Sequence, residues 1–171
     1  VGASSALRLT TGSQNAMFGH NAGDNVTTGS NNVLLGESAG NDAMINVTTA
    51  STQIVLGNNA STNATIKIDW TVTSDLRDKT EIKDVKHGLD FINQITPIEY
   101  KFKKSREDNT PTGDKKYGFK AQEILELEGD NPVIINNKDT DALKITNSHL
   151  IPVLINAIKE LTARVKELEN D

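Results

Sequence analysis

The sequence SDLRDK at residues 74–79 divides the chain into two stretches of different composition. Residues 1–73 are rich in Gly, Asn and Thr and carry only two of the 18 Lys and Arg residues and four of the 23 Asp and Glu residues. Residues 74–171 hold the other 16 cations and 19 anions, which favours a domain boundary at residue 74. Because the chain opens on Val1 without a signal peptide, we expect it to be part of a longer protein.

The overall composition excludes several classes of protein. Aromatic residues make up 4% and hydrophobic residues 36% of the chain, which is little for a self-sufficient core. The sequence has no cysteine, and its three histidines (His20, His87 and His149) are too dispersed to form a metal-ligand cluster. The net charge of −5 argues against nucleic-acid binding, and no apolar run approaches the roughly 20 residues of a membrane span. We therefore expect no cofactor, no metal, no nucleic-acid partner and no membrane insertion.

Residues 1–73 contain an internal repeat. The segment 12–23 (GSQNAMFGHNAG) matches the segment 29–40 (GSNNVLLGESAG), and a degenerate third copy covers 52–60. Each copy is a short apolar run of strand type followed by Gly and a polar turn. Units this small cannot bury a face alone, so stacking or assembly with other chains must supply the core. We predict an all-β repeat, trimeric, intertwined or β-helix-like, and the alternative is a disordered linker.

Residues 65–72 (TIKIDWTV) alternate apolar and polar side chains. This alternation predicts a last strand that leads into SDLRDK. The single tryptophan, Trp70, is either a core residue or a carbohydrate-binding platform. Since no second aromatic residue accompanies it, we favour the core.

Residues 74–146 show a mixed, non-repeating order of elements, which is typical of an α+β domain. Pro97 ends the first of its helices. The predicted elements are a helix over 89–95, a strand over 98–102, a polar loop over 103–116, a strand over 117–119, a helix over 121–127 and a hairpin that joins 133–135 to 143–145.

Residues 146–171 carry a heptad pattern that predicts a long coiled-coil helix. We expect Ser148 to be its N-cap, and Pro152 lies in the first turn, where a missing N–H costs little. Apolar residues step by 3, 4, 3, 4 and 3 positions, which favours a coiled coil over a helix packed on its own domain and leaves dimer and trimer both open. The predicted seam consists of Ile151, Leu154, Ile158, Leu161, Val165 and Leu168.

A serine followed five residues later by a lysine, at a boundary between two compositions, is a candidate self-cleavage site. Residues five apart do not align on one helix face, so a turn must fold Lys79 back onto Ser74. The alternative is that Ser74 only opens a turn and Lys79 is a solvated charge.

Four ordered blocks stand out in the second stretch: SDxRxK at 74–79, LDxIxxIxPIxY at 89–100, YGFxAQEI at 117–124 and LIPxLxxAIxEL at 150–161. Together they resemble the intramolecular chaperone domain of phage tail spikes and tail fibres, which is peptidase family S74. Three positions depart from the family pattern: Glu81 stands where asparagine is common, Lys120 where the family is usually apolar, and Asn147 where a tyrosine often precedes the last helix.

The resemblance implies a homotrimeric chaperone that assists folding of the fibre ahead of it and then removes itself by serine–lysine chemistry. Carried over by position, Ser74 is the nucleophile, Lys79 is the base, and Asp75 and Arg77 shape the site. The implied scissile bond is Thr73–Ser74 or the adjacent Ser74–Asp75. We expect one self-cleavage event per chain.

The resemblance also assigns the domains. Residues 1–73 would be the end of the fibre and could bind a host-cell receptor, while residues 74–171, with the coiled-coil helix at 146–171, would be the chaperone. The implied location is the virion tail, with folding in the host cytoplasm and release of the chaperone fragment. The main alternative is a permanently retained, non-cleaving trimerisation and receptor-binding tip. Some eukaryotic transcription factors carry the same domain, but residues 1–73 lack the basic surface that DNA binding needs.

Lysine can act as a base only when it is neutral. With an unperturbed pKa of about 10.4, about 1 lysine in 2,500 is neutral at pH 7. The site must therefore remove water from Lys79 or place another cation beside it, for which Arg77 is the candidate. Because trimer packing would bury the amine, we expect cleavage to depend on assembly.

Overall fold

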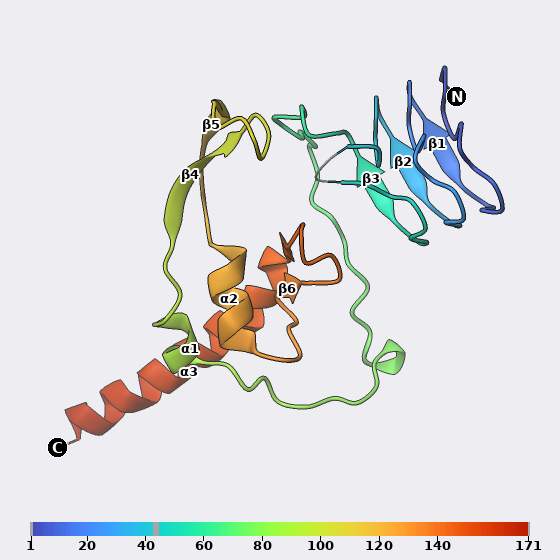
Figure 1. Ribbon diagram of the computed structural model, residues 1–171. Coiled ribbons are helices and arrows are strands. Elements are labelled where there is room, and N and C mark those ends of the chain that lie inside the picture. Colours follow the sequence, from blue (N-terminus) through green and yellow to red (C-terminus); the bar gives the residue numbers. More distant parts are fainter. Residues whose placement is uncertain (1, 43–44, 171) are drawn as a thin grey trace. The chain divides into compact units, whose positions relative to one another are not determined.

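The computed structural model describes residues 2–42 and 45–170 (Figure 1). Val1, which led us to expect a longer protein, lies outside the described residues. The chain forms two compact units, Val1–Lys67 and Ile68–Asp171. The boundary at residue 74 was predicted to separate the fibre end, residues 1–73, from the chaperone, residues 74–171. This functional assignment stays a prediction.

The first unit holds three short strands, one from each copy of the repeat. They are β1 (Ala16–Phe18), β2 (Val33–Leu35) and β3 (Ile54–Leu56), and they pair in parallel in the order β1-β2-β3 (Figure 1). The register places Met17 opposite Leu34 and Leu34 opposite Val55. Successive copies of the repeat therefore stack within one chain. The trimeric, intertwined or β-helix-like arrangement stays a prediction.

Asparagine has a structural role in the first two stacked repeats. The buried Asn32 donates from Nδ2 to the Ala50 carbonyl at 3.0 Å and accepts a hydrogen bond from the Gln53 N–H at 2.8 Å. One repeat earlier, Asn15 accepts from the Asn32 N–H at 2.9 Å. These bonds satisfy backbone groups that the short strands leave unpaired. The core of the first unit is a cluster of buried apolar residues, which are Met17, Ala22, Val26, Leu34, Ala39, Val47 and Val55.

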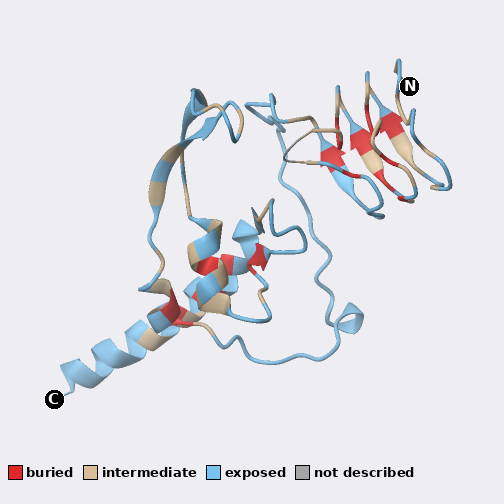
Figure 2. Ribbon diagram, viewed as in Figure 1, coloured by how far each residue is buried: buried red, intermediate tan, exposed pale blue. Residues whose placement is uncertain are grey.

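The segment 59–86 is exposed throughout (Figure 2). The strand predicted over 65–72 is absent, because a strand needs a hydrogen-bonded neighbour and none of the paired strands includes these residues. Trp70 is 72% exposed, so its predicted core position is wrong for the single chain.

The second unit is the predicted small α+β domain with a long terminal helix. The predicted loop over 103–116 is wrong in its second half, since Pro111–Gly118 pairs with Ile98–Lys103 in an antiparallel hairpin. The elements are α1 (Leu89–Ile92), β4 (Ile98–Lys103), β5 (Pro111–Gly118), α2 (Ala121–Glu128), β6 (Ile135–Asn136), β7 (Lys144–Ile145) and α3 (Leu150–Glu169).

Helix α3 begins later than its predicted cap. Ser148 lies in a 3₁₀ turn, η2 (Asn147–His149), that precedes the helix. The N-cap of α3 is His149, whose side chain makes no capping hydrogen bond. Pro152 lies in the first turn of α3, as predicted. The start of α3 packs into the domain core, which consists of Phe91, Ile124, Ile134, Ile135, Leu150 and Val153 (Figure 2).

Candidate functional site

The sequence SDLRDK forms a tight turn around η1 (Leu76–Asp78). Oδ1 of Asp75 accepts a hydrogen bond from the Arg77 N–H at 2.9 Å, which caps the turn at its start. The Lys79 N–H donates to the Leu76 carbonyl at 3.1 Å, which closes it. The turn supplies the reversal that the five-residue spacing requires.

Ser74 and Lys79 lie in contact as a result. Lys79 Nζ donates a hydrogen bond to Ser74 Oγ at 2.7 Å, and both side chains are exposed in the single chain. In this orientation the lysine is the donor, whereas a general base must accept the proton of the hydroxyl. The geometry therefore brings the two groups within reach, and the hydrogen bond must reverse before the serine can react.

Asp75 and Arg77 pair with each other rather than with Lys79. Arg77 Nε donates to Asp75 Oδ1 at 3.0 Å and Nη2 donates to Oδ2 at 2.6 Å. The Arg77 side chain and N–H hold the pKa of Asp75 below its ordinary value, and the same pairing raises the pKa of Arg77. The expected role of Arg77 as a cation beside Lys79 is thus weakened, since the carboxylate offsets its charge. Removal of water is the remaining way to make Lys79 neutral.

The residues of the predicted scissile bonds are accessible. Thr73, Ser74 and Asp75 lie outside the helices and strands and are exposed. Cutting either bond would break no strand pairing and no helical turn.

Helix α3 shows two apolar faces. Leu150, Val153 and Ala157 are buried against the domain, while the six predicted seam residues are all exposed in the single chain. The residues that attach α3 to its own domain are therefore different from those of the heptad seam. The seam residues are 44–77% exposed, and they are Ile151, Leu154, Ile158, Leu161, Val165 and Leu168.

Polar residues of α3 hold the chain where it enters the domain, and the sequence analysis did not identify them. Asn156 Nδ2 donates to the carbonyls of Val85 and His87 at 3.3 and 3.0 Å. Glu160 Oε2 accepts from the Leu89 N–H at 2.8 Å at the start of α1. Glu160 stands in the quoted block LIPxLxxAIxEL at 150–161 and lies outside the predicted seam.

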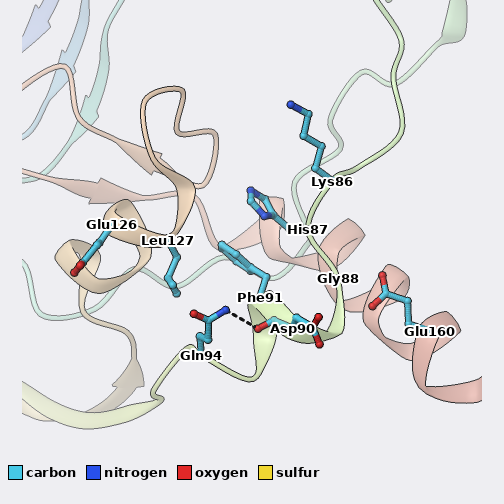
Figure 3. A pocket seen from close by; sticks show the side chains of 9 residues that line it. All are labelled: Lys86, His87, Gly88, Asp90, Phe91, Gln94, Glu126, Leu127 and Glu160. Atoms are coloured by element: carbon cyan, nitrogen blue, oxygen red, sulfur yellow. Dashed lines mark hydrogen bonds between the residues drawn. The ribbon is translucent and has the colours of Figure 1, made fainter. Parts of the chain in front are cut away.

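An open pocket of about 450 Å³ lies beside this contact (Figure 3). The His87 and Phe91 rings stack there with centroids 4.1 Å apart, and Gln94 donates to the Asp90 carbonyl. The nine lining residues include no serine, threonine or cysteine, so this pocket offers no hydroxyl or thiol nucleophile. They are Lys86, His87, Gly88, Asp90, Phe91, Gln94, Glu126, Leu127 and Glu160.

In the part of the chain that the structure describes, no group of three or more His, Cys, Asp or Glu could hold a metal ion. Within the same residues, every helix is too short or too polar to cross a membrane.

A serine hydroxyl hydrogen-bonded to a lysine amine, at the entrance of a small domain, is the pairing used by serine peptidases of the serine–lysine class. Residues 74–131 match the model of the peptidase S74 family, described as the chaperone of endosialidase. The match covers 58 of the 171 residues and supports an intramolecular chaperone role. No curated protein matches the chain.

Proposed function

We propose that residues 74–171 drive homotrimeric folding of a phage tail fibre or tail spike and then release themselves by self-cleavage at or next to Ser74. The client is the fibre region upstream, which includes residues 1–73 and could bind a host-cell receptor. Folding would take place in the host cytoplasm, and the fibre would then join the virion tail. The family match supports the chaperone role, and the 2.7 Å contact between Lys79 Nζ and Ser74 Oγ supports the chemistry.

In the proposed reaction, neutral Lys79 takes the proton of the Ser74 hydroxyl while Oγ attacks the Thr73 carbonyl carbon. The bond between the Thr73 carbonyl carbon and the Ser74 nitrogen breaks, and the departing amine takes up a proton. An ester then joins Thr73 to Ser74 Oγ, and water hydrolyses it. The released fragment begins at Ser74 and has 171 − 73 = 98 residues. Cleavage at Ser74–Asp75 is the neighbouring alternative.

Assembly is the proposed trigger. In the single chain Lys79 is exposed and donates to Ser74, so water and the bound proton both oppose base catalysis. The exposed seam of α3 offers the contact through which three chains would meet. Packing of the chains around the SDLRDK turn would remove water from the amine, so that cleavage follows correct folding.

The first experiment compares wild type with Ser74→Ala and Lys79→Ala on a denaturing gel and by intact mass. Wild type is expected to give two fragments from the 18.5 kDa chain, whereas both variants stay intact or cleave at least about 100-fold more slowly. Lys83→Ala is the matched control, since Lys83 is an exposed lysine of the same segment, and it should cleave like wild type. Normal cleavage of either dyad variant would refute the assignment.

The second candidate function is a permanently retained trimerisation and receptor-binding tip. The exposure of Ser74 and Lys79 favours it, since nothing in the single chain keeps water away from the pair. It predicts that a purified wild-type trimer shows only the intact mass.

A further inference from the structure

The three-stranded sheet of the repeat unit has a second apolar face. Side chains alternate along a strand, so the residues on either side of the buried Met17, Leu34 and Val55 point away from the core. The strand register aligns them in two columns that run across the sheet. All six are apolar: Ala16, Val33 and Ile54 form one column, and Phe18, Leu35 and Leu56 form the other. We call these six residues the outer sheet face.

The outer sheet face is largely uncovered in the single chain (Figure 2). Ile54 is 75% exposed, and Phe18, Leu35 and Leu56 are exposed as well. Ala16 and Val33 are half-buried. Parallel sheets are normally covered on both faces, and their strands read as continuous apolar runs, as AMF, VLL and IVL do here. Contiguous apolar patches larger than a few hundred Å² mark interaction sites on monomers, and this face reaches the lower end of that range. The sheet therefore offers a face suited to an apolar partner.

We propose that the outer sheet face packs against the same face of other copies of this chain, and this proposal rests on the proposed trimer. In a trimer, a patch that surrounds the threefold axis faces its own two symmetry copies, so a charge on the patch would meet its like. The six residues carry no charge. A partner must also present apolar columns at the strand spacing of about 4.8 Å, and a second copy does so by construction.

The size of the face explains why such a repeat needs a chaperone. Three strands and two columns span about 10 by 7 Å between side-chain centres, on the order of 200–300 Å² per chain. A stable interface buries roughly 800 Å² per partner, so three repeats alone associate weakly. The exposed seam of α3 lies on the same chain, and once it joins the copies their sheet faces meet at an effective concentration in the millimolar range. In this arrangement α3 of the chaperone brings the chains close together, and the outer sheet face of the client forms a second contact between them.

The absence of cysteine permits a direct cross-linking test in the full-length chain. Leu35→Cys and Ile54→Cys place a thiol on the outer sheet face, and Thr28→Cys places one at an exposed position outside the sheet. With a short bismaleimide, the two face variants are expected to give two-chain products in most molecules, and Thr28→Cys few. Ile54→Cys keeps the test valid if Leu35→Cys disturbs the fold.

A charge on the face provides the second arm. In a chain kept whole by Ser74→Ala, Leu35→Glu is expected to lower the cross-linking of Ile54→Cys several-fold, because like charges would meet, while sedimentation equilibrium still shows the trimer that α3 joins. A trimer whose face variants cross-link no more than Thr28→Cys would overturn the proposal and leave the proposed function standing. A wild-type chain that sediments as a monomer would instead refute the trimer itself. Cross-linking needs no cleavage, so failure of self-cleavage alone does not affect this result.

Discussion

At the scale of single residues, the SDLRDK turn rests on the pairing of Asp75 with Arg77. The bidentate contact and the Arg77 N–H lower the pKa of Asp75, so the contribution of this pair is present above the ordinary carboxylate pKa of about 3.9 and is lost as the pH falls through the lower value in the folded chain. We expect Arg77→Gln to raise the pKa of Asp75 toward its ordinary value, measured by the pH titration of its side-chain carbonyl carbon by NMR. Asp108, whose pKa is lowered by Thr110 and not by Arg77, is the internal control and should not move. An unchanged Asp75 titration would contradict the pairing.

The same pair sets an expectation for the pH dependence of cleavage. Asp75 stays ionised and Arg77 stays charged between pH 6 and 9, because their pairing shifts both titrations away from this range. A cleavage rate that rises with pH in this range would therefore report loss of a proton from another group, and the proposed base is the amine that contacts Ser74 Oγ.

At the scale of elements, leucine-to-alanine substitutions can distinguish the domain-facing side of α3 from its predicted seam. Leu150 is 6% exposed within the domain core, and Leu154 is 44% exposed on the predicted seam. Leu150→Ala should cost the domain about 2–5 kcal/mol of unfolding free energy, since it leaves a cavity. Leu154→Ala should cost the domain little and instead weaken association of the chains. Urea unfolding and sedimentation equilibrium measure the two effects, and equal losses of stability would show that both residues belong to one core.

At the scale of the whole molecule, the sequence predicts what depends on local pattern and fails where a partner decides. The α+β order, the heptad helix and the turn between Ser74 and Lys79 follow from spacing and composition, and each is present. The Asn156 and Glu160 contacts to residues 85–89 join positions about 70 apart, so no local pattern signals them. Glu81 adopts a left-handed backbone (φ 52°), which asparagine tolerates better, so the asparagine that is common at this position in the family fits the backbone here.

The missing strand at 65–72 leads to the last prediction. Ile66, Ile68, Trp70 and Val72 alternate as in a half-buried strand, yet all are exposed and unpaired by any strand of the single chain. If other copies complete this segment, the single Trp70 moves from water into an apolar contact on assembly. We expect its fluorescence emission to shift to the blue and its quenching by acrylamide to fall in the wild-type trimer. The comparison is Leu161→Asp, whose seam charge should keep chains apart while the domain core stays folded. Equal emission from the trimer and from this variant would mean that the alternating segment stays in solvent after assembly, and its apolar pattern would then need another cause.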